Sequence, residues 1–359
     1  MNIDEIKYMA ENGDAPWVDY PITENAGWDR LTILPAQLAR FPLFSAAEAS
    51  TEAVIGKNAI VPLRLSMPVI ISHMGLGALT TELKCALARG ASDAGIANGS
   101  GDGGVLEEEI QLSSAYIYEY TPGLYGLTPE VLERCSAVEI KLGQGCGGGT
   151  PFSVPSGAPE DIYRMRGGEV GAFFTSPGRF TDLTSPSDLK LMIDGLREGC
   201  GGKPVGIKIA AGNIEADLDL IIESGADFVT VDGGHGGWRG KSCLMGGIPA
   251  AAALRRAKRH LDNRKSDIDL IIAGGIGTAA DAAKALAMGA SAVAIGSAVL
   301  AAACGSVTGK SPFSTIETEA RISNYLRGLN SGLRDICAYT GRSHISDLNI
   351  TDLADSFKK

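Results

Sequence analysis

Residues 269–297 read DLIIAGGIGTAADAAKALAMGASAVAIGS, in which a short apolar run is followed by glycines, a helical segment and a second apolar run. The helical segment, Ala279 to Met288, is rich in alanine, and Gly289 supplies a usual C-terminal stop. Neither apolar run alternates with polar residues, which is typical of strands that are buried on both faces of a parallel sheet. The stretch therefore predicts a strand–helix–strand unit.

The same unit recurs along most of the chain. Amphipathic helical segments separate most of the apolar runs, and two of them, Thr80–Arg89 and Ser187–Glu198, begin with a good capping residue. Eight buried strands with helices between them predict an α/β fold, a (β/α)8 TIM barrel, and a doubly wound sheet is the alternative. The eight runs are PVIIS from Pro68, GIAN from Gly95, AYIYEY from Ala115, AVEIKLG from Ala137, VGIKIA from Val205, FVTVDG from Phe228, DLIIAGG from Asp269 and AVAIGS from Ala292.

Three parts of the chain can be distinguished. Residues 1–62 lack the repeating pattern and are predicted to be an N-terminal extension that packs on the barrel; Trp28 offers apolar surface for this. Residues 63–315 are predicted to form the barrel, and residues 316–359 a C-terminal helical segment with a polar tail. Residues 145–171, between the fourth and fifth runs, are longer than a barrel connection needs, which indicates a functional or disordered loop.

The composition argues against several classes of protein. The 359 residues are 45% hydrophobic and 21% charged, as in a globular chain with a large core. A net charge of -10 disfavours partners such as nucleic acids and anionic membranes. No uninterrupted apolar run approaches the roughly 20 residues of a membrane helix, and no secretory signal is visible, so we expect a cytoplasmic protein. Seven scattered cysteines without a CxxC pair predict reduced thiols and no metal site.

Three charged residues interrupt apolar runs near their C-terminal ends: Lys141, Lys208 and Asp232. In a barrel this end of the strands carries the active site. The alternative is that a lysine and an aspartate merely pair in the core, although burying ions is costly unless they are paired and hydrogen-bonded. Three such positions favour an active site over a structural ion pair.

The last two runs predict a phosphate site. Gly274 and Gly275 follow the seventh run, and Gly296 and Ser297 follow the eighth. Each loop leads into a helix N-terminus, where free backbone N–H groups and the helix dipole favour an anion. Barrel proteins commonly bind phosphate after strands seven and eight, although tight turns alone also use glycine. With lysines at the mouth, the pattern favours flavin mononucleotide (FMN) over a sugar phosphate.

Several motifs occur in a fixed order that resembles a known family. They are LPAQLARFPL, PLRLSMPVIISHMGLGALT, NGSGDGG, IKLGQG, TSPGRF, VDGGHGG, AGGIGT and AIGSA. In order and spacing they are similar to the motifs of the FMN-binding synthase domain of the glutamate synthase family, over about residues 30–350. The resemblance implies a stand-alone glutamate synthase-like flavoprotein with FMN across the barrel mouth.

The resemblance also implies roles for individual residues. Substrate carboxylates are held in the family by residues that correspond to Asn98, Lys141 and Arg166. Arg166 stands at the family interval before Ser176, and a guanidinium can bind a carboxylate through two hydrogen bonds; the alternative is a solvated loop arginine. The implied cofactor-binding residues are Met74, Gly75, Gly77, Gln144, Lys208, Asp232, Gly233, Gly274, Gly275, Gly296 and Ser297.

Some positions depart from the family pattern. Gly147 stands where the family has a lysine that helps to bind 2-oxoglutarate, which argues against 2-oxoglutarate as the acceptor. The family's three cluster-binding cysteines are reduced to Cys304, and one cysteine cannot hold an iron–sulfur cluster. Asp102 replaces a glutamate, a milder change.

Two histidines, His73 and His235, fall at predicted strand ends beside the proposed flavin site. Either one can be a packed histidine bonded to the backbone. The alternative is a catalytic group that moves a proton near flavin N5, because imidazole titrates in the useful range.

The resemblance implies an FMN-dependent oxidoreductase that acts on CH–NH2 donors and interconverts an amino acid and an imino or keto acid. One alternative is a catalytic subunit of a multi-subunit glutamate or N-methylglutamate-type synthase, with an electron-donor or amine-donor protein subunit as partner. Another is a flavin-binding electron-transfer component without turnover. A homo-oligomer is possible in each case.

Overall fold

The computed structural model describes residues 3–14, 27–149, 151–154, 156, 159–166, 168–234, 248–307 and 309–355. Among these residues, no helix is both long enough and apolar enough to cross a membrane.

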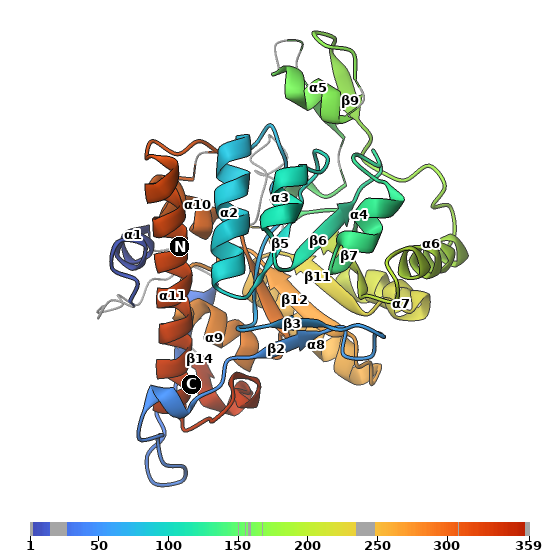
Figure 1. The fold of residues 1–359 in the computed structure, drawn as a ribbon. Coiled ribbons are helices and arrows are strands. Elements are labelled where there is room, and N and C mark those ends of the chain that lie inside the picture. Colours follow the sequence, from blue (N-terminus) through green and yellow to red (C-terminus); the bar gives the residue numbers. More distant parts are fainter. Residues whose placement is uncertain are drawn as a thin grey trace.

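Eight parallel strands close into a barrel, which confirms the predicted (β/α)8 fold (Figure 1). Neighbouring strands pair in chain order, and β13 pairs with β4 to close the ring. Every one of the eight predicted runs forms a barrel strand. The strands are β4 (Val69–Ile71), β5 (Ala97–Gly99), β6 (Tyr116–Tyr120), β7 (Ala137–Lys141), β10 (Val205–Ala210), β11 (Phe228–Asp232), β12 (Asp269–Ala273) and β13 (Ala292–Ile295).

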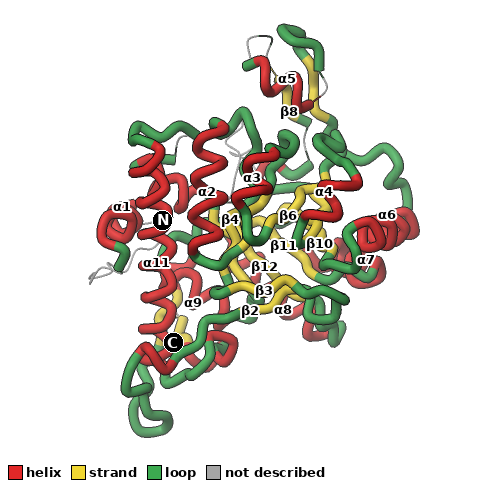
Figure 2. The backbone as a smooth tube through the Cα atoms, viewed as in Figure 1, coloured by secondary structure: helices red, strands yellow, loops and turns green. Residues whose placement is uncertain are grey.

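Helices follow the strands and cover the outside of the barrel (Figure 2). Their starts are set by capping side chains: Thr80 caps α2, and Ser185 with Asp188 forms a capping box at α6. The predicted helix at Ser187 thus begins slightly earlier, with Pro186 in its first turn. The helices are α2 (Thr81–Asp93), α3 (Glu107–Leu112), α4 (Pro129–Arg134), α6 (Pro186–Gly199), α7 (Ile214–Ser224), α8 (Ala250–Asn263), α9 (Ala279–Ala287) and α10 (Ser297–Cys304).

The interior of the barrel is apolar at one end and charged at the other. Ile117, Ala137 and Phe228 belong to the inner apolar cluster near the start of their strands. Because side chains alternate along a strand, residues two and four positions later also point inward. These later inward positions include Glu119, Glu139, Lys141, Thr230 and Asp232.

A two-stranded hairpin closes the apolar end. It consists of β2 (Ala53–Ile55) and β3 (Leu63–Leu65), and Ile55, Leu63 and Leu65 join the inner cluster. The backbone N–H of Gly56 donates to Asp269 at the start of β12, at 2.8 Å. The predicted boundary at residue 62 therefore falls between two strands of one hairpin.

The two ends of the chain interlock beside the barrel. Helix α1 (Ile3–Asn12) packs on α11 (Thr315–Thr340), and β1 (Leu31–Ile33) pairs antiparallel with β14 (Leu353–Asp355). Trp28 is buried, and its indole N–H donates to the carbonyl of Gly274 at 3.2 Å. Short 3-10 turns cover Trp28–Arg30, Ala46–Glu48, Gly145–Gly147, Ile345–Asp347 and Ile350–Asp352.

The long predicted loop between β7 and α6 contains its own small structure. Strands β8 (Phe152–Val154) and β9 (Phe174–Ser176) pair antiparallel, with α5 (Glu160–Arg166) between them. Figure 1 shows α5 and β9 projecting beyond the rest of the barrel.

Candidate functional site

Lys208 and Asp232 form a buried ion pair where β10 and β11 end. Lys208 Nζ lies 3.6 Å from Asp232 Oδ2, and the side chains are 2% and 5% exposed. Burial raises the pKa of Asp232, while Lys208 and a hydrogen bond from the Gly145 backbone act against this. Burial lowers the pKa of Lys208, but the carboxylates of Asp232, Glu119 and Glu139 outweigh it and raise the pKa overall. The carboxylates around Lys208 therefore favour its charged form.

Lys141, at the end of β7, lies on the next strand and faces two carboxylates. Its Nζ is 3.3 Å from Asp102 Oδ2 and 3.9 Å from Glu119 Oε2. The Lys141 side chain is 13% exposed, so it is more open to solvent than Lys208. The structure thus places all three predicted strand-end charges in the barrel mouth.

Two buried glutamates in this mouth were missed by sequence reasoning. Glu119 and Glu139 are buried inside β6 and β7, where their neighbours along the chain are aromatic or apolar. Burial acts against ionisation, but Lys141, His73 and Lys208 lower the pKa of Glu119. For Glu139, burial is likewise outweighed by His73 and Lys208, so its pKa is also lowered. The period of two along β7, which puts Glu139 on the same side as Lys141, is the signal that would have found it.

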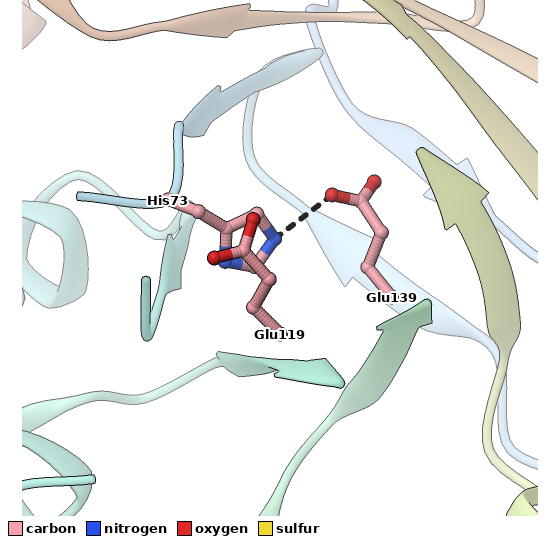
Figure 3. A group of neighbouring side chains, drawn as sticks. All are labelled: His73, Glu119 and Glu139. Atoms are coloured by element: carbon pink, nitrogen blue, oxygen red, sulfur yellow. Dashed lines mark ion pairs between the residues drawn. The ribbon is translucent and has the colours of Figure 1, made fainter. Parts of the chain in front are cut away.

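His73 follows β4 and lies next to both glutamates (Figure 3). Its Nε2 is 2.9 Å from Glu139 Oε2, and its Nδ1 is 3.4 Å from the backbone N–H of Gly101. A Cβ at Gly99 would lie 2.5 Å from His73 Nδ1, so β5 needs a glycine for the ring to fit. Thr230 donates its hydroxyl hydrogen to the other oxygen of Glu139.

The loops after β4 and β5 lie backbone against backbone beside His73. A Cβ at Gly75 would come within 2.5 Å of the Asp102 carbonyl oxygen. Lys84 of α2 ties the loops together from below: its Nζ donates to the carbonyls of Met74 at 3.0 Å and Ser100 at 2.6 Å. Glu109 neutralises Lys84 at 3.0 Å, and both side chains are 1% exposed.

Arg166, at the end of α5, reaches the same two loops. Its Nη2 donates to the carbonyl of Asp102 at 2.7 Å and to that of Leu76 at 3.4 Å. The guanidinium carbon lies 5.4 Å from the ring centroid of Tyr125. Burial lowers the pKa of Arg166, and Asp102 opposes this. Arg166 is therefore a partly buried arginine at the mouth rather than a solvated one.

Asn98 is placed differently from the other predicted substrate residues. Its neighbour Ala97 faces the inner cluster, so Asn98 points outward from β5. The Asn98 amide donates to Glu109 Oε1 at 3.0 Å, in the layer that holds Lys84. The structure brings Lys141 and Arg166 to Asp102, whereas Asn98 lies between the barrel and the surrounding helices, with Glu109 and Lys84.

The glycine loop after β7 closes over the ion pair. The N–H groups of Leu142 and Gly143 both donate to the Lys208 carbonyl, at 2.9 and 3.3 Å. Gln144 donates its N–H to the Gly148 carbonyl at 3.1 Å, which bends the loop back on itself. The loop therefore carries Gln144 to the mouth with its backbone held by β10.

The two predicted phosphate loops differ in how their helices begin. Thr278 and Asp281 form a capping box at α9, which satisfies its first N–H groups. Helix α10 begins after Gly296 and has no side-chain cap. A Cβ at Gly296 would meet its nearest atoms only at 3.8 and 3.9 Å, in Ser72 and Met74. Of the two helices, α10 is thus the one whose first N–H groups are not bonded by a capping side chain.

The remaining predicted residues are placed as follows. Gly233 donates its N–H to the Ala273 carbonyl at 2.9 Å, which joins the ends of β11 and β12. Gly275 lies in the turn after β12, with a φ of 68°. His235 lies outside the described residues.

Similar proteins were sought by sequence and by structure. The family described as "Conserved region in glutamate synthase" matches residues 29–310. A glutamate synthase large subunit-like protein of Rhizobium meliloti (strain 1021) is 36% identical over 284 residues, which cover 77% of this chain and 64% of that protein. An archaeal-type glutamate synthase [NADPH] of Thermotoga neapolitana is 33% identical over 255 residues, covering 68% of this chain and 50% of that protein.

Solved structures share the fold. An active chimera of (S)-mandelate dehydrogenase, in a glycine-to-alanine variant, gives a TM-score of 0.67 at 18% identity, covering 99% of both chains. A tyrosine-to-phenylalanine variant of mandelate oxidase with a monooxide FMN adduct gives a TM-score of 0.60 at 18% identity, covering 97% of this chain and 91% of that one. This chain matches only part of the length of these sequence relatives: 64% of the Rhizobium meliloti protein and 50% of the Thermotoga neapolitana protein. The extent of the match to the family and the identity to its members together show that the chain belongs to the glutamate synthase family.

Proposed function

We propose that the protein is an FMN-dependent oxidoreductase whose active site is the charged mouth of the barrel. The observation that carries the proposal is the buried Lys208, fixed by Asp232 at the mouth, with the uncapped start of α10 on the same barrel face. A cation at one place and free N–H groups at another suit the ring and the phosphate of one flavin nucleotide. Membership of the glutamate synthase family supports the same cofactor.

The residues present fit FMN. Gly296 and Ser297 would hold its phosphate, with Gly274 and Gly275 beside them, because no side chain of the described residues caps the start of α10 and a Cβ at Gly296 would meet nothing closer than 3.8 Å. The loop of Met74, Gly75 and Gly77, together with Gln144 and Lys208, would hold the flavin ring. Bound FMN supplies a ring that accepts a hydride and passes electrons on.

The substrate in this proposal is an amino acid that exchanges with its imino or keto acid. Lys141 and Arg166 are the cations that would hold its carboxylate, since both lie at Asp102 with part of their surface open. Asn98 enters this role only if its amide leaves Glu109. His73 has both ring nitrogens engaged, so a proton can leave it most directly from Nε2, toward Glu139.

Absorbance spectroscopy tests the cofactor. The purified protein should carry FMN with its usual near-ultraviolet and blue bands, before or after reconstitution. Lys208→Met should lower the FMN content, whereas Lys190→Met, on the exposed face of α6, should not. Protein that takes up no FMN under any condition would contradict the proposal.

Anaerobic mixing tests the substrate. A panel of amino acids should bleach the flavin, and Arg166→Lys should raise KM for the active acid at least tenfold, because hydrogen bonds to charged groups contribute about 1.5–3 kcal/mol. Arg164→Lys, on the same helix but exposed, is the matched control. A flavin inert to every amino acid and to NAD(P)H would instead support the binding-only alternative.

A second candidate is a catalytic subunit of a larger synthase. The name of one relative favours it, because the Rhizobium meliloti protein is described as a glutamate synthase large subunit-like protein. Under this alternative an electron-donor or amine-donor subunit should co-purify from native cells and speed the bleaching reaction. Full turnover by the isolated chain would argue against it.

A further inference from the structure

We propose that His73, Glu119 and Glu139 bind one divalent transition-metal ion, such as Mn²⁺, Fe²⁺ or Zn²⁺, in the barrel mouth. One ligand atom from each residue lies within 4.8 Å of the other two. In Figure 3 the carboxylates of Glu119 and Glu139 both point toward the His73 ring. The site does not depend on the proposed flavin chemistry.

Glu119 supplies the independent observation that points to a ligand. The residue is 2% exposed, yet neither carboxylate oxygen has a hydrogen-bond partner among the described residues. Its one ion pair, with Lys141, spans 3.9 Å. A buried carboxylate without a partner is costly, so Glu119 needs a cation or a hydrogen-bond donor at this place.

The charges at the mouth leave room for a divalent cation. Lys141 has Asp102 as its nearer partner and Lys208 has Asp232. Glu119 and Glu139 then remain as two carboxylates that face the imidazole of His73. Metal ligands must be deprotonated, and two carboxylates balance the charge of a divalent ion.

The ligand set selects the class of metal. Imidazole with carboxylates suits first-row transition ions better than Ca²⁺ or Mg²⁺, which prefer oxygen ligands only. Bonds of about 2.1 Å require donor atoms within about 4.2 Å of one another, so a small movement of the carboxylates completes the site. Thr230 already fixes the far oxygen of Glu139, as outer-shell partners of metal ligands do.

Two contacts must change on metal binding. The direct contact of 2.9 Å between His73 Nε2 and Glu139 Oε2 opens, because the metal takes the place of the Nε2 proton. A metal on Nε2 places the ring proton on Nδ1, which now faces the N–H of Gly101 at 3.4 Å. This distance is long for a hydrogen bond, so little is lost when the contact opens. Three protein ligands leave a coordination position for water or for a substrate atom at the mouth.

Metal analysis of the untagged protein, purified without chelators, tests the site. We expect close to one equivalent of transition metal per chain. After chelator treatment, Mn²⁺ should bind at one saturable site, and Zn²⁺ should displace it. The electron paramagnetic resonance signal of free Mn²⁺ measures both steps.

Glu119→Gln should abolish this binding, and Thr230→Val should weaken it by about 10–100-fold. Glu107→Gln is the matched control, because it makes the same change at an exposed glutamate that pairs with Arg134 and leaves Lys141 on Asp102. Circular dichroism confirms the fold of each variant, and FMN content is recorded separately. No saturable binding of Mn²⁺ or Zn²⁺, or binding that Glu119→Gln leaves unchanged, would overturn the proposal.

Discussion

At the scale of single residues, the clearest prediction concerns Lys84, which is not one of the proposed metal ligands. Its ammonium group donates to the carbonyls of Met74 and Ser100 and forms an ion pair with Glu109. Lys84→Met should destabilise the fold by about 3–5 kcal/mol, because it leaves Glu109 as a buried, uncompensated charge. Urea unfolding measures this. Exposed Lys190→Met is the control, and equal stability of both variants would contradict the prediction.

The residues of the site were predictable only in part. Lys141, Lys208 and Asp232 stood out because a charge that ends an apolar run is conspicuous. Glu119 and Glu139 did not, since they lie within strands rather than at their ends. The available signal was the period of two, which puts Glu139 on the same side of β7 as Lys141. The outward position of Asn98 follows from the strand period, but the partner it finds on α3 does not.

At the scale of elements, the β2–β3 hairpin acts as a plug for the apolar end of the barrel. Ile55 is fully buried in the inner cluster, whereas its neighbour Val54 is 37% exposed. Ile55→Ala should cost about 2–4 kcal/mol through the lost contacts and the cavity left behind. Val54→Ala on the same strand should cost much less. Chemical denaturation compares the two, and similar losses would show that the hairpin is not part of the core.

The β1–β14 sheet should loosen in acid. Asp352 accepts hydrogen bonds from Arg40 at 2.7 Å and from Arg342 at 3.0 Å. Burial acts to raise the pKa of Asp352, but these arginines outweigh it and lower the pKa overall. A lowered pKa in the folded state means that the stabilisation is complete above the ordinary value of about 3.9 and is lost as the pH falls below it.

Hydrogen exchange of Leu31–Ile33 measures this loosening. Exchange corrected for its intrinsic rate should accelerate as the pH falls from 5 toward 3 (about one unit either side of the ordinary pKa). Asp352→Asn should be faster at pH 5 and should show less further change. A wild-type rate that does not depend on pH in this range would refute the role of Asp352.

At the scale of the whole molecule, the barrel was predictable because its strands are apolar on both faces and recur at helix-sized intervals. The pieces around it were not. Strands such as β1, β2 and β14 have only three residues each, too few for a period of two to be read. Their partners are also far away in the chain, as Leu31 and Asp355 show.

This interlocking of distant segments predicts that the chain unfolds as one unit with its N-terminal helix. Met9 of α1 is fully buried against the core, whereas Tyr8 beside it is 44% exposed. Met9→Ala should cost about 2–5 kcal/mol, and Tyr8→Ala little. Tryptophan fluorescence and far-ultraviolet circular dichroism should report the same shifted midpoint for Met9→Ala. If α1 were an independent appendage, only a small early loss of helical signal would appear, and the main transition would stay in place.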